Sequence, residues 1–203
     1  WLKDNDIYHA PEFLSFDQGL KIPQVLTVHD LTMIKFPQHR GQGISSRHGK
    51  MLANACSKSA AIISVSESTK NDIVKYFQIK PEKITVTHLG YKPIFKKISD
   101  QNKIQRILSK YQINYPFILF VGTLEPRKNI TNLLLAFDQF IKSKPRKDYH
   151  LVLIGKKGWN ISAIEKTYQT ISAKNKVKFL DFISDEDLLY FYNSASLFCY
   201  PST

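Results

Sequence analysis

The sequence predicts an α/β protein with parallel sheets, divided into two domains. Strand-like and helix-like runs alternate along the whole 203-residue chain, which is the pattern of βαβ units. A polar stretch between Pro93 and Pro116 interrupts that alternation near the middle of the chain. We therefore expect a partial N-terminal domain over residues 1–92, a connection over residues 93–115 and a partial C-terminal domain over residues 116–203.

The N-terminal domain is expected to hold four strands and two helices. Short apolar and β-branched runs predict strands over residues 7–9, 24–28, 61–65 and 84–87. Helices are expected over residues 46–59 and 68–77. Ser66 can cap the second helix, because a serine oxygen before the first turn accepts a bond from a backbone N–H group.

The second half of the chain repeats this alternation. Strands are expected over residues 117–121, 150–154, 177–182 and 197–200. Helices are expected over residues 130–143, 161–174 and 185–195, with a polar helix near residues 104–111 inside the connection. No glycine-rich turn follows an opening strand, and no helix follows the last one. We therefore expect both domains to be incomplete.

Composition narrows the class of protein. Hydrophobic residues make up 43% of the chain and aromatic residues 12%, which is enough for a packed core. No apolar run approaches the roughly 20 residues that cross a bilayer, and the opening residues do not resemble a signal peptide. A cytoplasmic location is therefore expected. Cys56 and Cys199 fit no metal-binding spacing and are expected to be small core residues.

The net charge of +12 indicates an anionic partner, which could be nucleic acid, lipid headgroups or phosphorylated sugars. The interval between Asp30 and Glu67 contains no carboxylate. Five cations fall in that interval: Lys35, Arg40, Arg47, Lys50 and Lys58. They form either the solvated face of a helix or a surface near an anionic acceptor or the cytoplasmic face of a membrane.

The stretch that leads from the strand at 117–121 into the next helix is the strongest indication of a ligand. Gly122 ends the apolar strand, and Arg127 and Lys128 stand just before a helix that Asn129 can cap. Cations there oppose the positive end of the helix dipole, which costs about 0.3–1 kcal/mol each, whereas an anion would reverse that sign. The pair could be two solvated charges, but the strand–glycine–helix setting favours a phosphate site.

Two further strand ends belong to the same edge of the predicted sheet, where open parallel sheets bind ligands. Gly155 and Lys156 follow the strand at 150–154, and the polar segment Ser184-Asp-Glu-Asp187 follows the strand at 177–182. Together these loops predict a crevice for a diphosphate with a nucleoside attached. Trp159 could stack on a base or pack beneath its loop.

Two histidines end strands of the N-terminal domain. His29 closes the strand at 24–28 and can donate or accept a hydrogen bond near neutral pH. A role in a binding site and a buried structural role are equally compatible with its position. His9 ends the first strand, and the same two interpretations apply to it.

These motifs resemble those of the family 4 retaining glycosyltransferases, also described as glycosyl transferases group 1. The run Phe120-Val-Gly-Thr-Leu-Glu-Pro-Arg-Lys-Asn129 is similar to the phosphate loop of that family. Supporting similarities occur in the same order along nearly the whole chain: His9-Ala-Pro11, Thr27-Val-His-Asp-Leu31, Ile63-Ser-Val-Ser-Glu-Ser68, Leu153-Ile-Gly155, Phe182-Ile-Ser-Asp-Glu-Asp-Leu188 and Tyr200-Pro-Ser202.

Membership of that family would imply a GT-B fold, in which two Rossmann-like domains face each other across a cleft. A hexose would move from a GDP- or UDP-sugar to a polysaccharide or lipid-linked acceptor, with retention of configuration. The phosphate loop resembles those of bacterial mannosyltransferases, so mannose from GDP-mannose is the first expectation. Contact with the cytoplasmic face of the membrane is left open, and nucleic acid is not expected as a partner.

The resemblance also implies roles for individual residues. Arg127 and Lys128 would bind the diphosphate and stabilise the leaving group, and His29 would contact the donor sugar. These three are the expected catalytic residues. The implied donor-binding residues are Gly122, Thr123, Arg127, Lys128, Gly155, Lys156, Phe182, Ile183 and Ser184. The implied acceptor-side residues are His9, Arg47 and Lys50.

The family works without a catalytic metal, and no cofactor is expected. Asp4-Asn-Asp6 and Asp185-Glu-Asp187 imitate the Asp-x-Asp signature of metal-dependent sugar transfer. The first lies at the wrong end of its strand. The second is explained by the start of a capped helix, where acidic side chains are favourable.

One departure from the family pattern concerns the end of the chain. A Glu-x7-Glu motif that holds the donor should follow Pro201-Ser202, but the sequence ends at Thr203. We therefore expect the chain to be part of a longer protein, and we do not expect it to turn over substrate by itself. Two alternatives stay open: a non-catalytic protein that binds anions or nucleic acid, and an inactive relic of a transferase.

Overall fold

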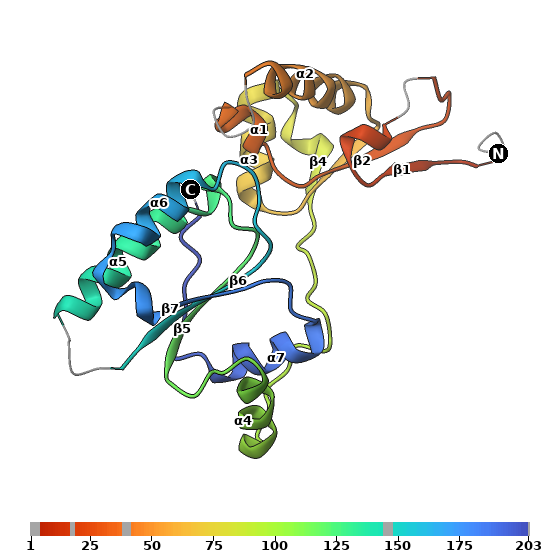
Figure 1. The fold of residues 1–203 in the computed structure, drawn as a ribbon. Helices are drawn as coiled ribbons and strands as arrows, with labels where there is room; N and C mark the ends of the chain where they lie inside the picture. The colour runs from red at the N-terminus through yellow and green to blue at the C-terminus, as the bar shows by residue number, and fades with distance from the viewer. Residues whose placement is uncertain (1–4, 17–18, 38–41, 144–147, 203) are drawn as a thin grey trace. The chain divides into compact units, whose positions relative to one another are not determined.

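We describe the protein from a computed structural model, in which residues 5–16, 19–37, 42–143 and 148–202 are described, without the side chains of residues 42–45 (Figure 1). The chain forms two compact units, Trp1–Gly90 (unit 1) and Tyr91–Thr203 (unit 2). Each unit contains a four-stranded sheet, and every strand pairing is parallel. The predicted α/β class with parallel sheets is confirmed.

Unit 1 is built on the strand order β1-β2-β3-β4. The strands are β1 (Tyr8–Ala10), β2 (Gln24–Val28), β3 (Ala61–Ser64) and β4 (Ile84–Val86). The helices are α1 (Thr32–Lys35), α2 (Gln42–Lys58) and α3 (Glu67–Phe77), with short 3-10 turns η1 (Phe13–Ser15) and η3 (Pro81–Lys83). Leu26, Leu52 and Ile73 come from β2, α2 and α3 and are at most 1% exposed, so strands and helices share one core.

Unit 2 has the strand order β7-β6-β5-β8. The strands are β5 (Phe117–Val121), β6 (His150–Ile154), β7 (Val177–Leu180) and β8 (Leu197–Phe198). The helices are α4 (Gln101–Lys110), α5 (Ile130–Ser143), α6 (Ser162–Thr170) and α7 (Asp185–Ser194), with 3-10 turns η4 (Pro126–Lys128) and η5 (Ser172–Lys176). All eight predicted strands are therefore present in the two units.

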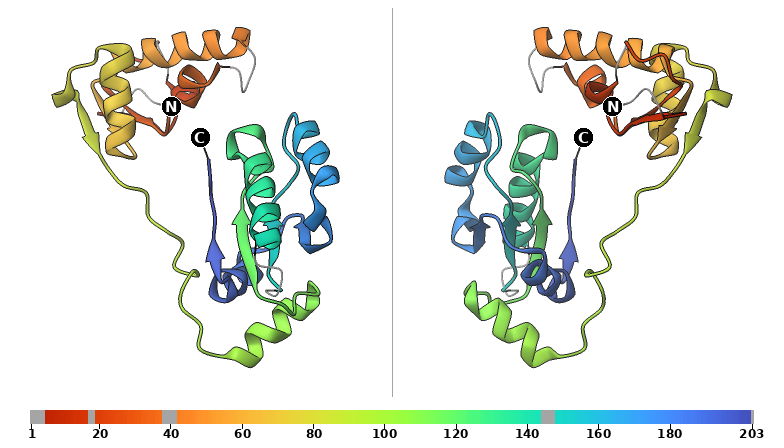
Figure 2. Two further views of the ribbon diagram at one scale, coloured as in Figure 1. Left: turned by 90° about the vertical axis from the view of Figure 1, so that its left-hand side faces the viewer. Right: turned by 90° about the vertical axis from the view of Figure 1, so that its right-hand side faces the viewer.

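Both faces of the central strands in unit 2 are covered by helices (Figure 2). Phe117 and Leu119 of β5 pack in the cluster that contains α4 and α7, whereas Phe120 packs in the cluster that contains α5. Successive residues of a strand point to opposite faces, so a strand buried on both sides is apolar throughout. This arrangement explains why β5 and β6 are continuous apolar runs in the sequence.

Several segments differ from the sequence-based expectation: α1 was not predicted, and β7 and β8 end at Leu180 and Phe198, two residues earlier than predicted. The helix predicted over residues 161–174 ends at Thr170, because Ile171 is extended (φ −71°, ψ 144°) and places a 4% exposed side chain in the core. Helix α4 lies in the segment expected to connect two domains, yet it packs against α7 inside unit 2. Its buried residues Ile104 and Ile107 form the apolar stripe of an amphipathic helix.

In the part of the chain that the structure describes, every helix is too short or too polar to span a bilayer.

Candidate functional site

The carboxyl ends of β5 and β6 approach each other so closely that only glycine fits. Gly122 and Gly155 have φ values of +153° and +149°. The amide of Gly122 donates to the carbonyl of Ile154 at 2.9 Å, which continues the β5–β6 ladder past the strands. A Cβ atom on Gly155 would stand 2.0 Å from the carbonyl oxygen of Gly122. The two loops therefore begin in direct backbone contact.

Backbone hydrogen bonds keep the two loops together further on. Leu124 donates its amide to the carbonyl of Lys156 at 3.0 Å and accepts from the amide of Gly158 at 2.9 Å. A Cβ atom on Gly158 would lie 2.8 Å from Cγ2 of Thr123 and 2.9 Å from the carbonyl oxygen of Leu124. The loops after β5 and β6 thus form one surface, which we call the paired loops (residues 122–129 and 155–159).

Arg127 projects from η4, the 3-10 turn that immediately precedes α5. Its Nη2 and Nε donate to the same oxygen of Glu125, Oε1, at 2.8 and 3.1 Å. The side chain of Arg127 is 29% exposed and that of Glu125 is 13% exposed. The ion pair with Glu125 therefore holds Arg127 just before the start of α5, as the sequence predicted.

Trp159 joins the second of the paired loops to the first. Its indole Nε1 donates to Oε2 of Glu125 at 3.1 Å, and the residue is 38% exposed. The sequence offered stacking on a base or packing beneath the loop as its roles. In the structure the indole is a hydrogen-bond donor that bridges the two loops.

Lys128 contacts Tyr200, which lies just beyond β8. Its amino group donates to the Tyr200 hydroxyl and lies 4.6 Å from the centroid of that ring. The Tyr200 ring stacks on Phe120 of β5, with centroids 5.5 Å apart and planes 10° from parallel. Tyr200 was not among the predicted site residues, although the sequence Tyr200-Pro-Ser202 was noted as a similarity to the family.

Asn129 differs from its predicted role as a helix cap. It adopts a left-handed conformation (φ 56°) and ends η4. Its side-chain oxygen accepts from the side chain of Asn132 at 2.8 Å, while its backbone carbonyl accepts the amide of Leu133 in the first turn of α5. The predicted bond from the Asn129 side chain to a backbone amide is thus replaced by a bond between two side chains.

The end of β7 adds an exposed aromatic ring. Phe182 is 72% exposed, and Nζ of Lys156 lies 5.6 Å from its ring centroid. Ile183 is 6% exposed and packs in the core, so its side chain does not face solvent. Ser184 caps α7, because its hydroxyl accepts from the amide of Asp187 at 3.3 Å. Phe182 is therefore the most exposed side chain of residues 182–184.

Of the two predicted histidines, His29 follows the last residue of β2, whereas His9 does not end its strand but lies within β1, in register with Val25. His29 is exposed, and its Nε2 lies 3.2 Å from the carbonyl oxygen of Pro11. A carbonyl only accepts hydrogen bonds, so Nε2 is the protonated nitrogen and Nδ1 is left as an acceptor in the neutral ring. His9 pairs through Nε2 with the buried hydroxyl of Thr27 at 2.8 Å. The exposure of His29 contradicts the buried structural role.

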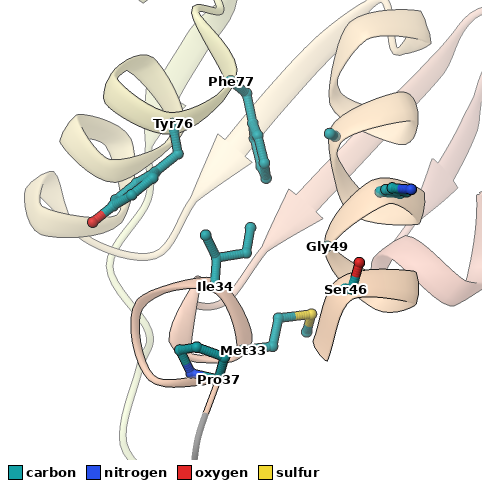
Figure 3. A pocket seen from close by; sticks show the side chains of 9 residues that line it. Met33, Ile34, Pro37, Ser46, Gly49, Tyr76 and Phe77 are labelled. Carbon is teal, nitrogen blue, oxygen red and sulfur yellow. The ribbon is translucent and has the colours of Figure 1, made fainter. Parts of the chain in front are cut away.

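The predicted acceptor-side cations Arg47 and Lys50 lie on α2, and both are exposed. Lys50 lines a pocket of about 410 Å³, and Figure 3 shows its walls coming from α1, α2 and α3. The other lining residues are mainly apolar: Met33, Ile34, Pro37, Ser46, Gly49, Ala53, Tyr76 and Phe77. Lys35 forms an ion pair with Asp72 at 2.9 Å, and Arg40 lies outside the described residues.

The second Asp-x-Asp sequence is occupied by structural contacts. Asp185 pairs with Lys92, and Asp187 accepts from the hydroxyl of Tyr111 at 2.7 Å. Burial, followed by this bond, raises the pKa of Tyr111 to about 12. Asp4 lies outside the described residues. Among the described residues, no group of three or more histidine, cysteine or acidic side chains is arranged to hold a metal ion.

Comparison with known families gives two matches that together span most of the chain. Residues 101–203 match the family model of the glycosyl transferases group 1, and residues 1–93 match that of glycosyltransferase family 4. The match to the first covers half of the chain.

Curated relatives include two O-antigen chain mannosyltransferases. The O-antigen chain mannosyltransferase B of Escherichia coli is 29% identical over 197 residues, which cover 97% of this chain and 51% of that protein. The O-antigen chain mannosyltransferase RfbU of Salmonella typhimurium is 27% identical over 181 residues, or 88% of this chain and 45% of that protein. The chain thus spans about half the length of the curated relatives it matches.

Solved structures share the fold at lower identity. Sucrose-phosphate synthase from Thermosynechococcus elongatus has a TM-score of 0.77 at 19% identity, covering 97% of this chain and 50% of that one. Anabaena Alr3699/HepE, in complex with UDP-glucose, has a TM-score of 0.76 at 20% identity, covering 97% and 53%. These likenesses show the fold, which is the GT-B class that the resemblance predicted.

Proposed function

The chain belongs to the glycosyl transferases group 1 family. We propose that the full-length protein is a hexosyltransferase, which moves mannose from a nucleotide diphosphate sugar to a saccharide or lipid-linked acceptor. This proposal depends on one observation: the paired loops of unit 2 place Arg127 and Lys128 just before the start of α5. A helix start with cations beside it is a favourable place for a diphosphate.

The proposed chemistry is electrostatic. As the bond between the anomeric carbon and the diphosphate oxygen breaks, negative charge grows on the leaving group, and Arg127 and Lys128 stabilise it. Fixed cations and backbone dipoles at such a position lower the barrier because they need no reorganisation during the reaction. The oxygen of an acceptor hydroxyl forms the new glycosidic bond on the same face of the sugar, with retention of configuration, and its proton passes to the departing diphosphate. The proposed reaction needs no metal or cofactor.

The remaining donor-binding residues act through backbone or ring surfaces in this proposal. Gly122, Thr123 and Gly155 allow the diphosphate to approach the backbone of the paired loops, and Lys156 adds a cation at the same edge. The exposed ring of Phe182 offers a face for the nucleoside base. His29 binds a hydroxyl group of the sugar through Nδ1, which the Pro11 contact leaves as an acceptor.

The identity of the donor rests on the named relatives. Two of them are O-antigen chain mannosyltransferases, which supports mannose, and hence GDP-mannose as the donor. The structural relative that holds UDP-glucose keeps a UDP-sugar as the second candidate. Calorimetric titration with GDP and UDP separates the two, because the correct base adds contacts that the diphosphate alone cannot supply.

The acceptor side is proposed to lie on unit 1. Arg47 and Lys50 are exposed cations on α2, and an apolar pocket opens beside Lys50 (Figure 3). Cations next to an apolar pocket suit a lipid-linked saccharide, whose phosphate is anionic and whose tail is apolar. The same surface would favour contact with the cytoplasmic face of a membrane, where each nearby cation contributes about 1 kcal/mol.

The test is calorimetry on the full-length protein with two single variants. Arg127→Ala and Lys128→Ala are each expected to weaken binding of a nucleoside diphosphate by about 1.5–3 kcal/mol, the scale for a hydrogen bond to a charged group. Lys174→Ala is the matched control, because Lys174 is an exposed cation of η5, the turn before the amino end of β7. Unchanged GDP and UDP affinity in both variants would contradict the proposal.

A second outcome would point to the other function class. A protein that binds nucleic acid through its net charge of +12 would show affinity for generic DNA or RNA that falls steeply with salt. Loss of such binding in Lys174→Ala as much as in Lys128→Ala would favour a diffuse basic surface over a phosphate site.

A further inference from the structure

Glu125 sits between the paired loops and uses both of its carboxylate oxygens. Oε1 accepts from Nη2 and Nε of Arg127, at 2.8 and 3.1 Å. Oε2 accepts from the indole Nε1 of Trp159, on the other loop, at 3.1 Å. The Glu125 side chain is only 13% exposed. One carboxylate therefore links the cation after β5 to the loop after β6.

A carboxylate in this position needs an explanation, because it would repel a diphosphate bound to the same loop. The contact geometry offers one. The Arg127 guanidinium is a planar fork of several N–H donors, and Glu125 engages the Nε and Nη2 side of that fork. The Nη1 side then remains for an anion. A long side chain that is already held in one orientation loses less conformational entropy when a ligand binds.

Trp159 prevents the carboxylate from turning away. Its N–H group fixes Oε2, while the backbone bonds between Leu124 and the second loop fix the distance between the two loops. Gly158 lets them approach, because a Cβ atom there would lie 3.3 Å from Cβ of Glu125. The orientation of Arg127 thus depends on a residue of the neighbouring loop.

We propose that Glu125 is a positioning residue for donor binding: it holds the Arg127 guanidinium toward the diphosphate and is itself held by Trp159. This inference rests on the proposed function, since it assumes that the paired loops bind a diphosphate. Glu125 acts through Arg127 and does not touch the reacting atoms.

Two physical effects of the carboxylate have opposite signs, which makes the inference testable. As a positioning group, Glu125 strengthens diphosphate binding, so Glu125→Ala weakens it. As a competing anion, Glu125 would neutralise Arg127, so the same substitution would strengthen binding. A structural role alone would lower the stability of unit 2 and change affinity in the same way whether or not Arg127 is present.

The experiment is a double-mutant cycle, measured by calorimetry with GDP and UDP on the full-length protein. Glu125→Ala is expected to weaken binding about tenfold, the scale of one charge-assisted hydrogen bond. The effect should vanish when Arg127 is already alanine, because the two residues act as one unit. Glu125→Gln keeps one oxygen for Arg127 but turns an NH2 group toward the Trp159 N–H donor, so its affinity should lie between those of the original protein and Glu125→Ala. Trp159→Phe removes the same Trp159 bond but keeps the charge on Glu125, so it should weaken binding less than Glu125→Gln.

The outcomes separate the inference from the proposed function. If the unsubstituted protein binds neither GDP nor UDP, the proposed function fails and the inference fails with it. If the protein binds and Arg127→Ala weakens binding, while Glu125→Ala has an undiminished effect in the Arg127→Ala background, only the inference is overturned. Tighter binding by Glu125→Ala would also overturn it. Thermal unfolding of each variant confirms that affinities are compared between folded proteins.

Discussion

The carboxyl edges of the two sheets have the same architecture but different chemistry. In unit 2 the edge carries Arg127, Lys128 and Lys156 on loops that backbone hydrogen bonds join directly. In unit 1 the edge carries His29, which is held by a backbone carbonyl, while His9 lies within β1 and pairs with the Thr27 hydroxyl. One edge therefore offers cationic side chains, and the other offers an imidazole ring that makes hydrogen bonds.

The difference between the two edges matches the two chemically different parts of a nucleotide sugar, the diphosphate and the sugar. A diphosphate is best bound by cations and backbone amides, which suits unit 2. Sugar hydroxyls need oriented acceptors and donors of modest strength, which suits the Nδ1 atom of His29. The same βα alternation thus supplies a cationic edge and an imidazole edge, and the proposed function assigns the diphosphate to the first and the sugar to the second.

The largest expected effect concerns the close approach that forms the cationic edge. Gly155→Ala should destabilise unit 2 by more than about 3 kcal/mol, because its φ of +149° is unfavourable for alanine and the new Cβ would clash with the Gly122 carbonyl at 2.0 Å. Urea unfolding followed by circular dichroism measures the change.

Gly90→Ala is the matched control for that variant. A Cβ atom on Gly90 would meet nothing within 4 Å, so the free energy of unfolding should change by no more than about 0.5 kcal/mol. Equal unfolding curves for the two variants would show that the paired loops do not depend on glycine.

The next prediction concerns Asp138, a buried residue of unit 2 that lies outside the paired loops. Asp138 of α5 is 6% exposed and accepts from the amide of Ala173 at 2.8 Å and from Lys142 at 2.6 Å. Asp138→Ala should lower the free energy of unfolding by about 1.5–3 kcal/mol, since it removes the charged acceptor of a buried amide. Affinity for GDP should stay unchanged in the folded protein, and a parallel loss would mean that stability and binding are not separable.

The same residue predicts a dependence on pH. The hydrogen bond from Lys142, followed by those from Ala173 and Ser172, holds the pKa of Asp138 below its ordinary value of 3.8. A depressed pKa in the folded state stabilises the protein above pH 3.8, and that contribution is lost as the pH falls through the lower folded value. The stability difference between the unsubstituted protein and Asp138→Asn should therefore shrink below pH 3.8. A difference that is constant from pH 6 to pH 3 would contradict this account.

The smallest effect concerns the hydrogen bond between Thr27 and His9 in unit 1. Thr27→Val removes the buried hydroxyl that pairs with His9 and should lower the stability of unit 1 by about 1 kcal/mol, the net contribution of a neutral hydrogen bond. Thr85→Val, at the exposed position of β4, is the control, with an expected change below about 0.5 kcal/mol. If Thr27→Val matched the control, the His9–Thr27 contact would not stabilise unit 1.

The contrast between local and distant contacts also explains how far the sequence could predict the structure. The strands were predictable because runs such as Phe117–Val121 carry their own signal of burial on both faces. The packing of α4 against α7 could not be predicted, because the sequence of an amphipathic helix does not indicate which neighbour its apolar stripe contacts.

The same distinction holds at the candidate site. The place of Arg127 and Lys128 between β5 and α5 could be predicted, because an apolar strand that ends at a glycine and an amphipathic helix flank them in the sequence. The contact of Lys128 with Tyr200 spans 72 positions, and that of Glu125 with Trp159 spans 34. Both depend on which strands lie side by side, and therefore only the structure reveals them. The sequence indicated which charged residues lie at the candidate site, but only the fold shows which residues orient them.

The central claim is that unit 2 binds the diphosphate and unit 1 binds the sugar. The most direct test is a calorimetric comparison of Lys128→Ala with His29→Ala, each titrated with GDP and with GDP-mannose on the full-length protein. Lys128→Ala should weaken both ligands at least about tenfold, whereas His29→Ala should leave GDP affinity unchanged and weaken GDP-mannose by about two- to tenfold, the scale of one neutral hydrogen bond. Equal loss of GDP affinity in both variants, or unchanged GDP affinity in Lys128→Ala, would contradict the account.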